Sequence, residues 1–293
     1  MKRISENVIQ MGNRHFNYFL VGNQEKAIIE CGVTGGVQSV KSKLEELPNW
    51  PDVKYLVAMH AHFDHICGIP ALKELFPQAK VLGSNDTHKV VSKPKILENF
   101  FYQDQMMSKT LVDEGILNGL PKGPPNNAIA IDQIIGEGDV IELNGLKIKV
   151  LEAPGHSPCS LACYLPEEQV MFLSDAAGFQ ISESEIFPIF FQSYKLYMET
   201  IKRLKGFPTR VLCLPHEQVW VKRDIDDFYV RAMESACWVF DSINSMLDAG
   251  WEEEKIVETL FNYYYRGNLR IYTPENITIC VQLLIRRVKE YTG

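Results

Sequence analysis

His60-Ala61-His62-Phe63-Asp64-His65 places four potential metal ligands within six consecutive residues. The stretch follows an apolar, β-branched run at residues 53–59 and precedes residues 68–76, whose apolar side chains recur at helical spacing. The sequence therefore predicts that these ligands lie on a loop between a strand and a helix. Because alternate side chains of an extended segment point the same way, we expect His60 and His62 to face one ion. Asp64 and His65 follow the end of the strand, where the turning backbone can direct their side chains to a neighbouring metal position.

Three more candidate ligands directly follow apolar runs further along the chain. These are His156, Asp175 and His216. A single histidine after a strand usually caps a neighbouring element or packs in the core. The interpretation as a metal site therefore depends on all seven residues together. Imidazole and carboxylate groups suit zinc, iron or manganese, and seven such ligands are enough for two divalent metal ions.

The combined pattern resembles the metallo-β-lactamase superfamily from the N-terminus to about residue 218. The resemblance is carried by the His-x-His-x-Asp-His loop, the Pro-Gly before His156, the Ser before Asp175 and the Pro before His216. It implies an α/β fold, the αββα sandwich of that superfamily. It also implies that His60, His62 and His156 bind the first metal, that Asp64, His65 and His216 bind the second, and that Asp175 bridges the two.

The motifs also distinguish among branches of the superfamily. True β-lactamases of this fold lack the second histidine at the end of the first motif and usually carry cysteine in place of Asp175, so the pattern is similar to the glyoxalase II-like branch. Within that branch, the order of spacings is similar to the thioesterase-like quinolone-signal response proteins of pseudomonads. Two local departures are Glu217, where the superfamily usually has glycine, and Glu30-Cys31-Gly32, where many members have Asp-x-Gly.

Composition favours one compact enzyme that acts on small molecules. The chain has 293 residues, with 37 acidic and 30 basic residues and a net charge of −7. Without a lysine and arginine stripe, a nucleic-acid partner is disfavoured. No signal-peptide pattern begins the chain and no apolar run approaches the ~20 residues of a membrane span, so we expect a cytoplasmic protein without membrane association. Its seven cysteines are scattered through apolar segments, as is typical of reduced thiols.

The pattern of elements predicts a sandwich domain at residues 1–222 and a helical C-terminal extension at residues 223–293. Helices are expected at residues 37–47 and 194–205. Strands are expected at residues 7–11, 18–21, 26–31, 53–59, 130–134, 139–143, 146–152, 160–165, 170–174 and 210–214.

A helical insertion at about residues 94–127 interrupts the strands. Phe100, Met107 and Leu111 define its apolar face, and a turn-rich loop at residues 120–127 closes it. This insertion either covers the edge of the active site or is a surface addition without a role in the site. The aromatic run at residues 186–191 lines an apolar substrate pocket or belongs to the core.

The C-terminal extension shows amphipathic helical periodicity from Phe228 onward. Gly250 predicts a helix end, and Thr273-Pro274 predicts the N-cap and first residue of a last helix. These helices are expected to pack on the sandwich, to cap the metal cleft or to form a homodimer interface.

Two neighbouring metal ions can hold a bridging hydroxide at neutral pH and polarise a carbonyl group. We therefore expect a hydrolase in which this hydroxide attacks the carbonyl of a small-molecule thioester or carboxylic ester. Asp175, as the bridging ligand, and Asp64, which can also hydrogen-bond the hydroxide, are the candidate catalytic residues. Three alternatives stay open: a lactonase, an iron-dependent redox enzyme such as a persulfide dioxygenase, and a regulatory protein acting through binding.

Overall fold

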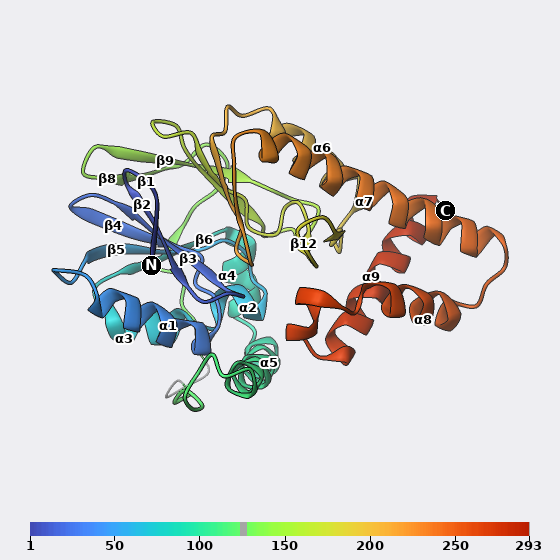
Figure 1. Ribbon diagram of the computed structural model, residues 1–293, viewed down its shortest axis with the longest axis horizontal. Coiled ribbons are helices and arrows are strands. Elements are labelled where there is room, and N and C mark those ends of the chain that lie inside the picture. Colours follow the sequence, from blue (N-terminus) through green and yellow to red (C-terminus); the bar gives the residue numbers. More distant parts are fainter. Residues whose placement is uncertain (124–127, 293) are drawn as a thin grey trace. The chain divides into compact units, whose positions relative to one another are not determined.

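The structure is a computed structural model that describes residues 1–123 and 128–292 (Figure 1). The chain forms two compact units, each assembled from separate segments. The first contains residues 1–152, 159–174 and 210–219, and the second contains residues 153–158, 175–209 and 220–293. The predicted boundary at residue 222 stays a prediction.

The first unit contains a seven-stranded sheet. Its strands are antiparallel from β1 to β4 and parallel from β4 to β7. The strand order is β1 (Lys2–Ser5), β2 (Val8–Gly12), β3 (Asn17–Gly22), β4 (Glu25–Ile29), β5 (Asp52–Ala58), β6 (Lys80–Gly83), β7 (Gln133–Ile134).

A six-stranded sheet faces the first one. Its order is β15 (Val219–Val221), β14 (Val211–Cys213), β11 (Val170–Phe172), β10 (Leu161–Leu165), β9 (Leu146–Glu152), β8 (Val140–Leu143). Strand β9 alternates in the way a half-buried strand requires, because Ile148 and Val150 are buried while Lys147 and Lys149 are exposed.

The core of the first unit lies between the two sheets. Apolar side chains from both inner faces form one continuous cluster. Phe19 of β3 meets Phe172 of β11 edge to face, with ring centroids 5.3 Å apart. Helices α1 (Thr34–Glu45) and α3 (Ile69–Leu75) lie on the other side of the seven-stranded sheet (Figure 1). The predicted α/β fold with two sheets is confirmed.

The predicted insertion is mainly helical. It follows α4 (Asn85–Val91) and consists of the 20-residue helix α5 (Pro94–Asp113). Met107 and Leu111 are buried as predicted, whereas Phe100 is only half-buried and the polar Asp104 shares the buried face. Part of the predicted turn-rich loop, residues 124–127, lies outside the described residues.

Asp104 of α5 holds the first turn of α1, since its Oδ1 accepts a hydrogen bond of 2.8 Å from the Thr34 backbone nitrogen. Burial raises the pKa of Asp104 to about 6, although the hydrogen bonds to Thr34 oppose this change. A carboxyl pKa that is higher in the folded state than in the unfolded chain makes folding less favourable as pH rises.

We therefore expect the free energy of unfolding of the wild-type protein to fall as the pH rises from 3.8 to 7, whereas Asp104→Asn should not show this fall. Over this range the wild type should lose about 3 kcal/mol relative to the variant. The asparagine keeps an oxygen for the Thr34 N–H but carries no charge at any pH. Urea titrations of both proteins across this range measure the difference. If the difference in unfolding free energy between the two proteins did not change with pH, the raised pKa of Asp104 would be contradicted.

The second unit is predominantly helical. It contains β12 (Phe179–Gln180) and β13 (Ile186–Phe187), which form a short hairpin. Its helices are α6 (Tyr194–Lys205), α7 (Arg223–Asp248), α8 (Glu253–Tyr264) and α9 (Pro274–Thr292), with a 3-10 helix at Gly267–Ile271. The helical character of the C-terminal extension is confirmed.

The predicted helix end at Gly250 and the predicted N-cap at Thr273 are also confirmed. Gly250 follows α7 with φ +74°, a conformation that glycine adopts without strain. Thr273 caps α9, because its Oγ1 accepts a hydrogen bond of 3.2 Å from the Asn276 backbone nitrogen.

One predicted strand is shorter than expected, and five short strands of the described structure were not predicted: β1, β6, β12, β13 and β15. Residues 130–134 form only the two-residue strand β7, where the Asp132 carboxylate also accepts from the Val81 nitrogen at 2.8 Å. Strand β6 was not predicted, because its four residues are too few for alternation to be recognised.

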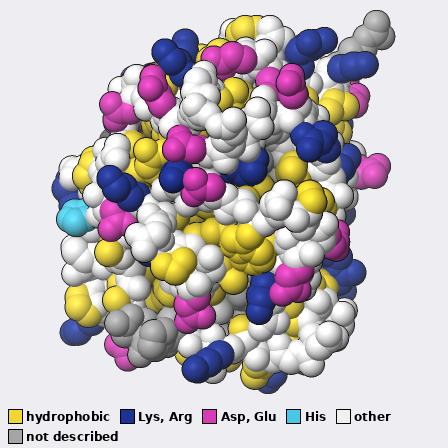
Figure 2. All heavy atoms as spheres, turned by 90° about the vertical axis from the view of Figure 1, so that its left-hand side faces the viewer, with side chains coloured by type: hydrophobic (Ala, Val, Ile, Leu, Met, Phe, Trp, Pro, Cys, Tyr) yellow, Lys and Arg dark blue, Asp and Glu magenta, His cyan; other side chains and the backbone are white. Residues whose placement is uncertain are grey.

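The surface carries charges of both signs. Acidic and basic side chains are interspersed on the face that Figure 2 shows, around a central area of hydrophobic side chains. Within the described chain, no helix combines the length and the apolar character that crossing a membrane requires. No disulfide bond joins any of the seven cysteines, all of which the structure describes, and five of them are buried.

Candidate metal centre

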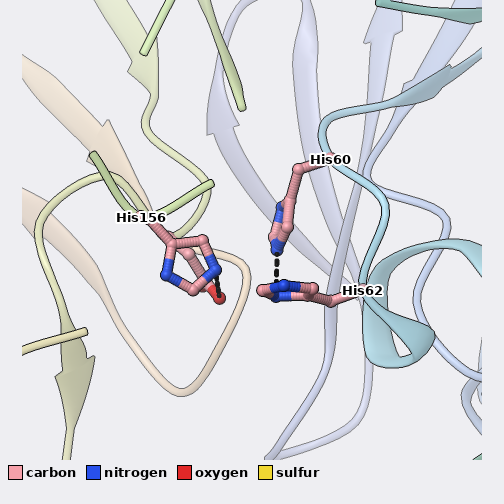
Figure 3. A group of neighbouring side chains, drawn as sticks. His60, His62 and His156 are labelled. Carbon is pink, nitrogen blue, oxygen red and sulfur yellow. Dashed lines mark hydrogen bonds and ion pairs between the residues drawn. The ribbon is translucent and has the colours of Figure 1, made fainter. Parts of the chain in front are cut away.

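Residues 59–62 lead from β5 (Asp52–Ala58) into the short helix α2 (Phe63–Ile66). The sequence predicted a loop over all of residues 60–65, whereas Asp64 and His65 lie in this helix. His62 has extended backbone angles and is the N-cap of α2. His60 Nε2 and His62 Nδ1 lie 3.1 Å apart (Figure 3). Two nitrogens bound to one zinc ion at tetrahedral angles would be about 3.4 Å apart, so this pair fits a shared cation.

A triad of buried ligands lies beside this pair in the first unit. Asp64 and His65 come from α2, and His216 follows β14. The two Nε2 atoms are 3.3 Å apart, and Asp64 Oδ2 lies 3.7 Å from His65 Nε2 and 3.6 Å from His216 Nε2. A point equidistant from three such atoms is about 2 Å from each, which is the metal–ligand distance for zinc with nitrogen and oxygen donors. The donor set and its spacing therefore fit a divalent cation.

The Nδ1 atoms of these histidines are held from distant parts of the chain. His65 Nδ1 lies 2.9 Å from Glu30 Oε2, and His216 Nδ1 donates to the His15 carbonyl oxygen at 3.0 Å. Because carboxylates and carbonyl oxygens only accept, the proton of each ring is on Nδ1 and the lone pair is on Nε2. His60 Nδ1 contacts Ser174 Oγ at 3.2 Å.

The second unit holds the remaining two predicted ligands next to each other. His156 Nε2 lies 3.5 Å from Asp175 Oδ2, and His156 Nδ1 donates to the Ile189 carbonyl oxygen at 2.8 Å. This ring therefore carries its proton on Nδ1, in the same tautomer as His65 and His216. Both side chains are buried.

The sequence did not predict that Glu30, Ser174 and His15 contact the ligand histidines. Glu30 is buried and comes directly after β4, so an acidic residue at the end of an apolar strand was an available signal. Ser174 was noted as part of the motif before Asp175, but the motif does not reveal its contact with His60. His15 acts through its backbone oxygen, which no side-chain motif reveals.

Glu217, the departure from glycine, pairs with His15. Glu217 Oε1 lies 2.9 Å from His15 Nδ1, and Glu114 Oε2 lies 2.8 Å from His15 Nε2. Burial lowers the pKa of His15, but the Glu217 and Glu114 carboxylates outweigh it and the net pKa is raised. The backbone of Glu217 has φ +59°, the region that favours glycine. Glu217 therefore combines a left-handed backbone conformation with a side-chain contact to His15, directly beside His216.

Replacing Glu30 by Gln tests the orientation of His65. The amide keeps the shape but loses the charge that strengthens the hydrogen bond from Nδ1, so we expect metal affinity to fall by about 10- to 100-fold. Competition with a chromogenic chelator measures this affinity. Glu45→Gln, at the end of α1, is the control and should bind metal like wild type. Equal affinity of Glu30→Gln and wild type would remove Glu30 from the site.

Comparison with known proteins identifies the family. The sequence profile of the metallo-beta-lactamase superfamily matches residues 12–216, a range that includes all seven predicted ligands. The chain belongs to this superfamily.

Curated members of the superfamily share limited identity with this chain. Hydroxyacylglutathione hydrolase GloC of Haemophilus influenzae is 27% identical over 162 residues, covering 54% of this chain and 65% of the relative. Acyl-coenzyme A thioesterase MBLAC2 of Gallus gallus is 24% identical over 189 residues, covering 59% and 61%. The chain thus spans just under two thirds of the length of these relatives. A glyoxalase II-like placement agrees with them, and the likeness to quinolone-signal response proteins stays a prediction.

Solved structures of superfamily members share the fold. A superfamily protein from Sulfolobus tokodaii superposes with a TM-score of 0.59 at 18% identity, covering 98% of this chain and 99% of that protein. The similarity therefore extends beyond the range of the sequence profile.

Proposed function

We propose that this protein is a dinuclear metal-dependent hydrolase of a thioester or carboxylic ester. The observation that carries the proposal is the triad of Asp64, His65 and His216, whose ligand atoms surround a point at metal-binding distance. A buried carboxylate beside two imidazoles whose lone pairs are on Nε2 is a favourable environment for a divalent cation.

The proposed ligand set follows the superfamily pattern. Asp64, His65 and His216 would hold one cation. By the same pattern, His60, His62 and His156 would hold the other, and Asp175 would bridge the two. The contact between His156 and Asp175 within their own unit supports their joint role.

Two such cations, when bound, lower the pKa of water and polarise a carbonyl oxygen. The chain's own residues fix the geometry in which this happens. Glu30 and the His15 carbonyl orient the rings of His65 and His216, and Asp64 supplies negative charge. Burial raises the pKa of the Cys67 thiol well above its ordinary range, so this cysteine beside α2 is a poor nucleophile. A nucleophile activated by metal is thus favoured over a thiolate.

The substrate class is supported by the names of two relatives. One is a hydroxyacylglutathione hydrolase and the other an acyl-coenzyme A thioesterase, so both names describe thioester hydrolysis. A thioester carbonyl presents one oxygen for polarisation and a thiolate as leaving group.

A substrate screen with metal control tests the proposal. Protein purified without added metal is analysed for zinc, iron and manganese, and is then assayed with acyl thioesters, aryl esters and homoserine lactones. We expect thioester or ester hydrolysis that a chelator abolishes and added metal restores. Hydrolysis that survives complete metal removal would refute the proposal, and preference for lactones would refute the substrate class. Oxygen uptake with glutathione persulfide in place of hydrolysis would indicate redox chemistry.

A further inference from the structure

A cavity of about 370 Å³ in the first unit lies beside α5 and the start of α1. This volume is within the range of pockets that bind small molecules, roughly 300–1,000 Å³. Helix α5 contributes most of its lining, including the aromatic rings of Phe101 and Tyr102. None of the seven predicted metal ligands lines it.

Two polar side chains of this cavity are almost fully buried. Asp104 is 4% exposed and Ser108, one helical turn later, is 2% exposed. The Ser108 hydroxyl has no hydrogen-bond partner among the described residues. A buried polar atom without a partner is unfavourable unless a ligand or water satisfies it. The hydroxyl thus marks a place where a hydrogen-bonding group is missing.

The polar part of the cavity is acidic. The influences on the pKa of Asp104 are burial, which raises it, and hydrogen bonds from Thr34, which lower it; no cation is among them. Glu98 adds a second carboxylate to the lining, which contains no lysine, arginine or histidine among the described residues. The hydrogen bond to Thr34 explains how Asp104 holds α1. It does not explain why this carboxyl group lines a cavity that has no lysine, arginine or histidine in its described lining.

We infer that this cavity binds a small organic cation, an amine with an aryl or short alkyl body. The ammonium group would donate hydrogen bonds to Asp104 and Ser108, and the apolar body would pack against Phe101. Such a ligand would neutralise a buried carboxylate and satisfy the buried hydroxyl at once. The aromatic ring beside it also favours a cation. This inference does not depend on the proposed hydrolase activity.

Three probes with the same aromatic body test the inference in the full-length protein. Benzylamine is cationic at pH 7.5, benzyl alcohol is neutral and benzoate is anionic. We expect isothermal titration calorimetry to show benzylamine binding at least tenfold more tightly than benzyl alcohol, with no binding of benzoate. Benzylamine should bind equally well to metal-loaded and to chelator-treated protein. A result against the proposed metal site can therefore be distinguished from a result against this cavity.

Variants locate the bound amine. Asp104→Asn keeps an oxygen for Thr34 and should weaken benzylamine at least tenfold, whereas Glu98→Gln, at an exposed position, should weaken it by a smaller factor. Asp113→Asn, at the exposed end of α5, is the matched control and should bind like wild type. Equal benzylamine affinity in wild type and Asp104→Asn, or tighter binding of benzoate than of benzylamine, would overturn the inference. If Asp104→Asn does not fold, the inference is tested by the titration of Glu98→Gln with benzylamine and by the comparison of the three probes on the wild-type protein.

Discussion

Replacing Asp64 by Asn is expected to lower kcat/KM for the best thioester or ester by about 10³-fold, equivalent to about 4 kcal/mol of transition-state stabilisation. The amide has nearly the same size as the carboxylate, so the fold should be preserved. It removes the negative charge from a triad whose other two members are neutral imidazoles. We therefore also expect the variant to retain about one metal per chain, against the two proposed for wild type.

Metal analysis and steady-state kinetics on the same preparation measure both effects. The matched control is Asp86→Asn, on the surface of α4, where the carboxylate pairs with Lys89. This variant should keep wild-type metal content and activity. Full activity of Asp64→Asn at wild-type metal content would exclude an essential role for the Asp64 carboxylate in metal binding and in catalysis.

Replacing Gly155 by Ala is expected to destabilise the second unit by about 3 kcal/mol or more. Gly155 has φ +121°, which L side chains rarely adopt, and an added Cβ would lie 2.3 Å from the backbone nitrogen and Cα of Tyr197. These atoms belong to the first turn of α6 and cannot move without shifting the helix. Because Gly155 directly precedes His156, metal content should fall together with stability.

Gly145→Ala separates the steric clash from backbone strain. Gly145 also has a positive φ, +93°, but nothing lies within 4 Å of its added Cβ. Strain alone should cost this variant about 1–3 kcal/mol without loss of metal. Denaturant unfolding and metal analysis of both variants make the comparison. Equal stability and equal metal content of the two variants would show that the contact of Gly155 with Tyr197 has no role in holding His156.

Much of the fold was predictable, because long elements carry their own periodicity. The helix at residues 194–205 was predicted with the bounds of α6, and the strand at residues 146–152 with those of β9. The short strand β6 was not predicted, and β7 was predicted at residues 130–134 but spans only two residues. They form by pairing with neighbouring strands, and so few residues carry no periodic signal of their own.

The sequence by itself determined which side chains are candidate ligands, because the spacing of the loop at residues 60–65 is a local property of the chain. It also determined the family, since the motifs follow in the superfamily's order. Only the tertiary structure decided which atoms orient the rings, because Glu30 and the His15 carbonyl reach His65 and His216 from distant parts of the chain. The cavity beside Asp104 likewise arises only where α5 approaches α1, since hydrogen bonds and cavities between distant segments depend on packing.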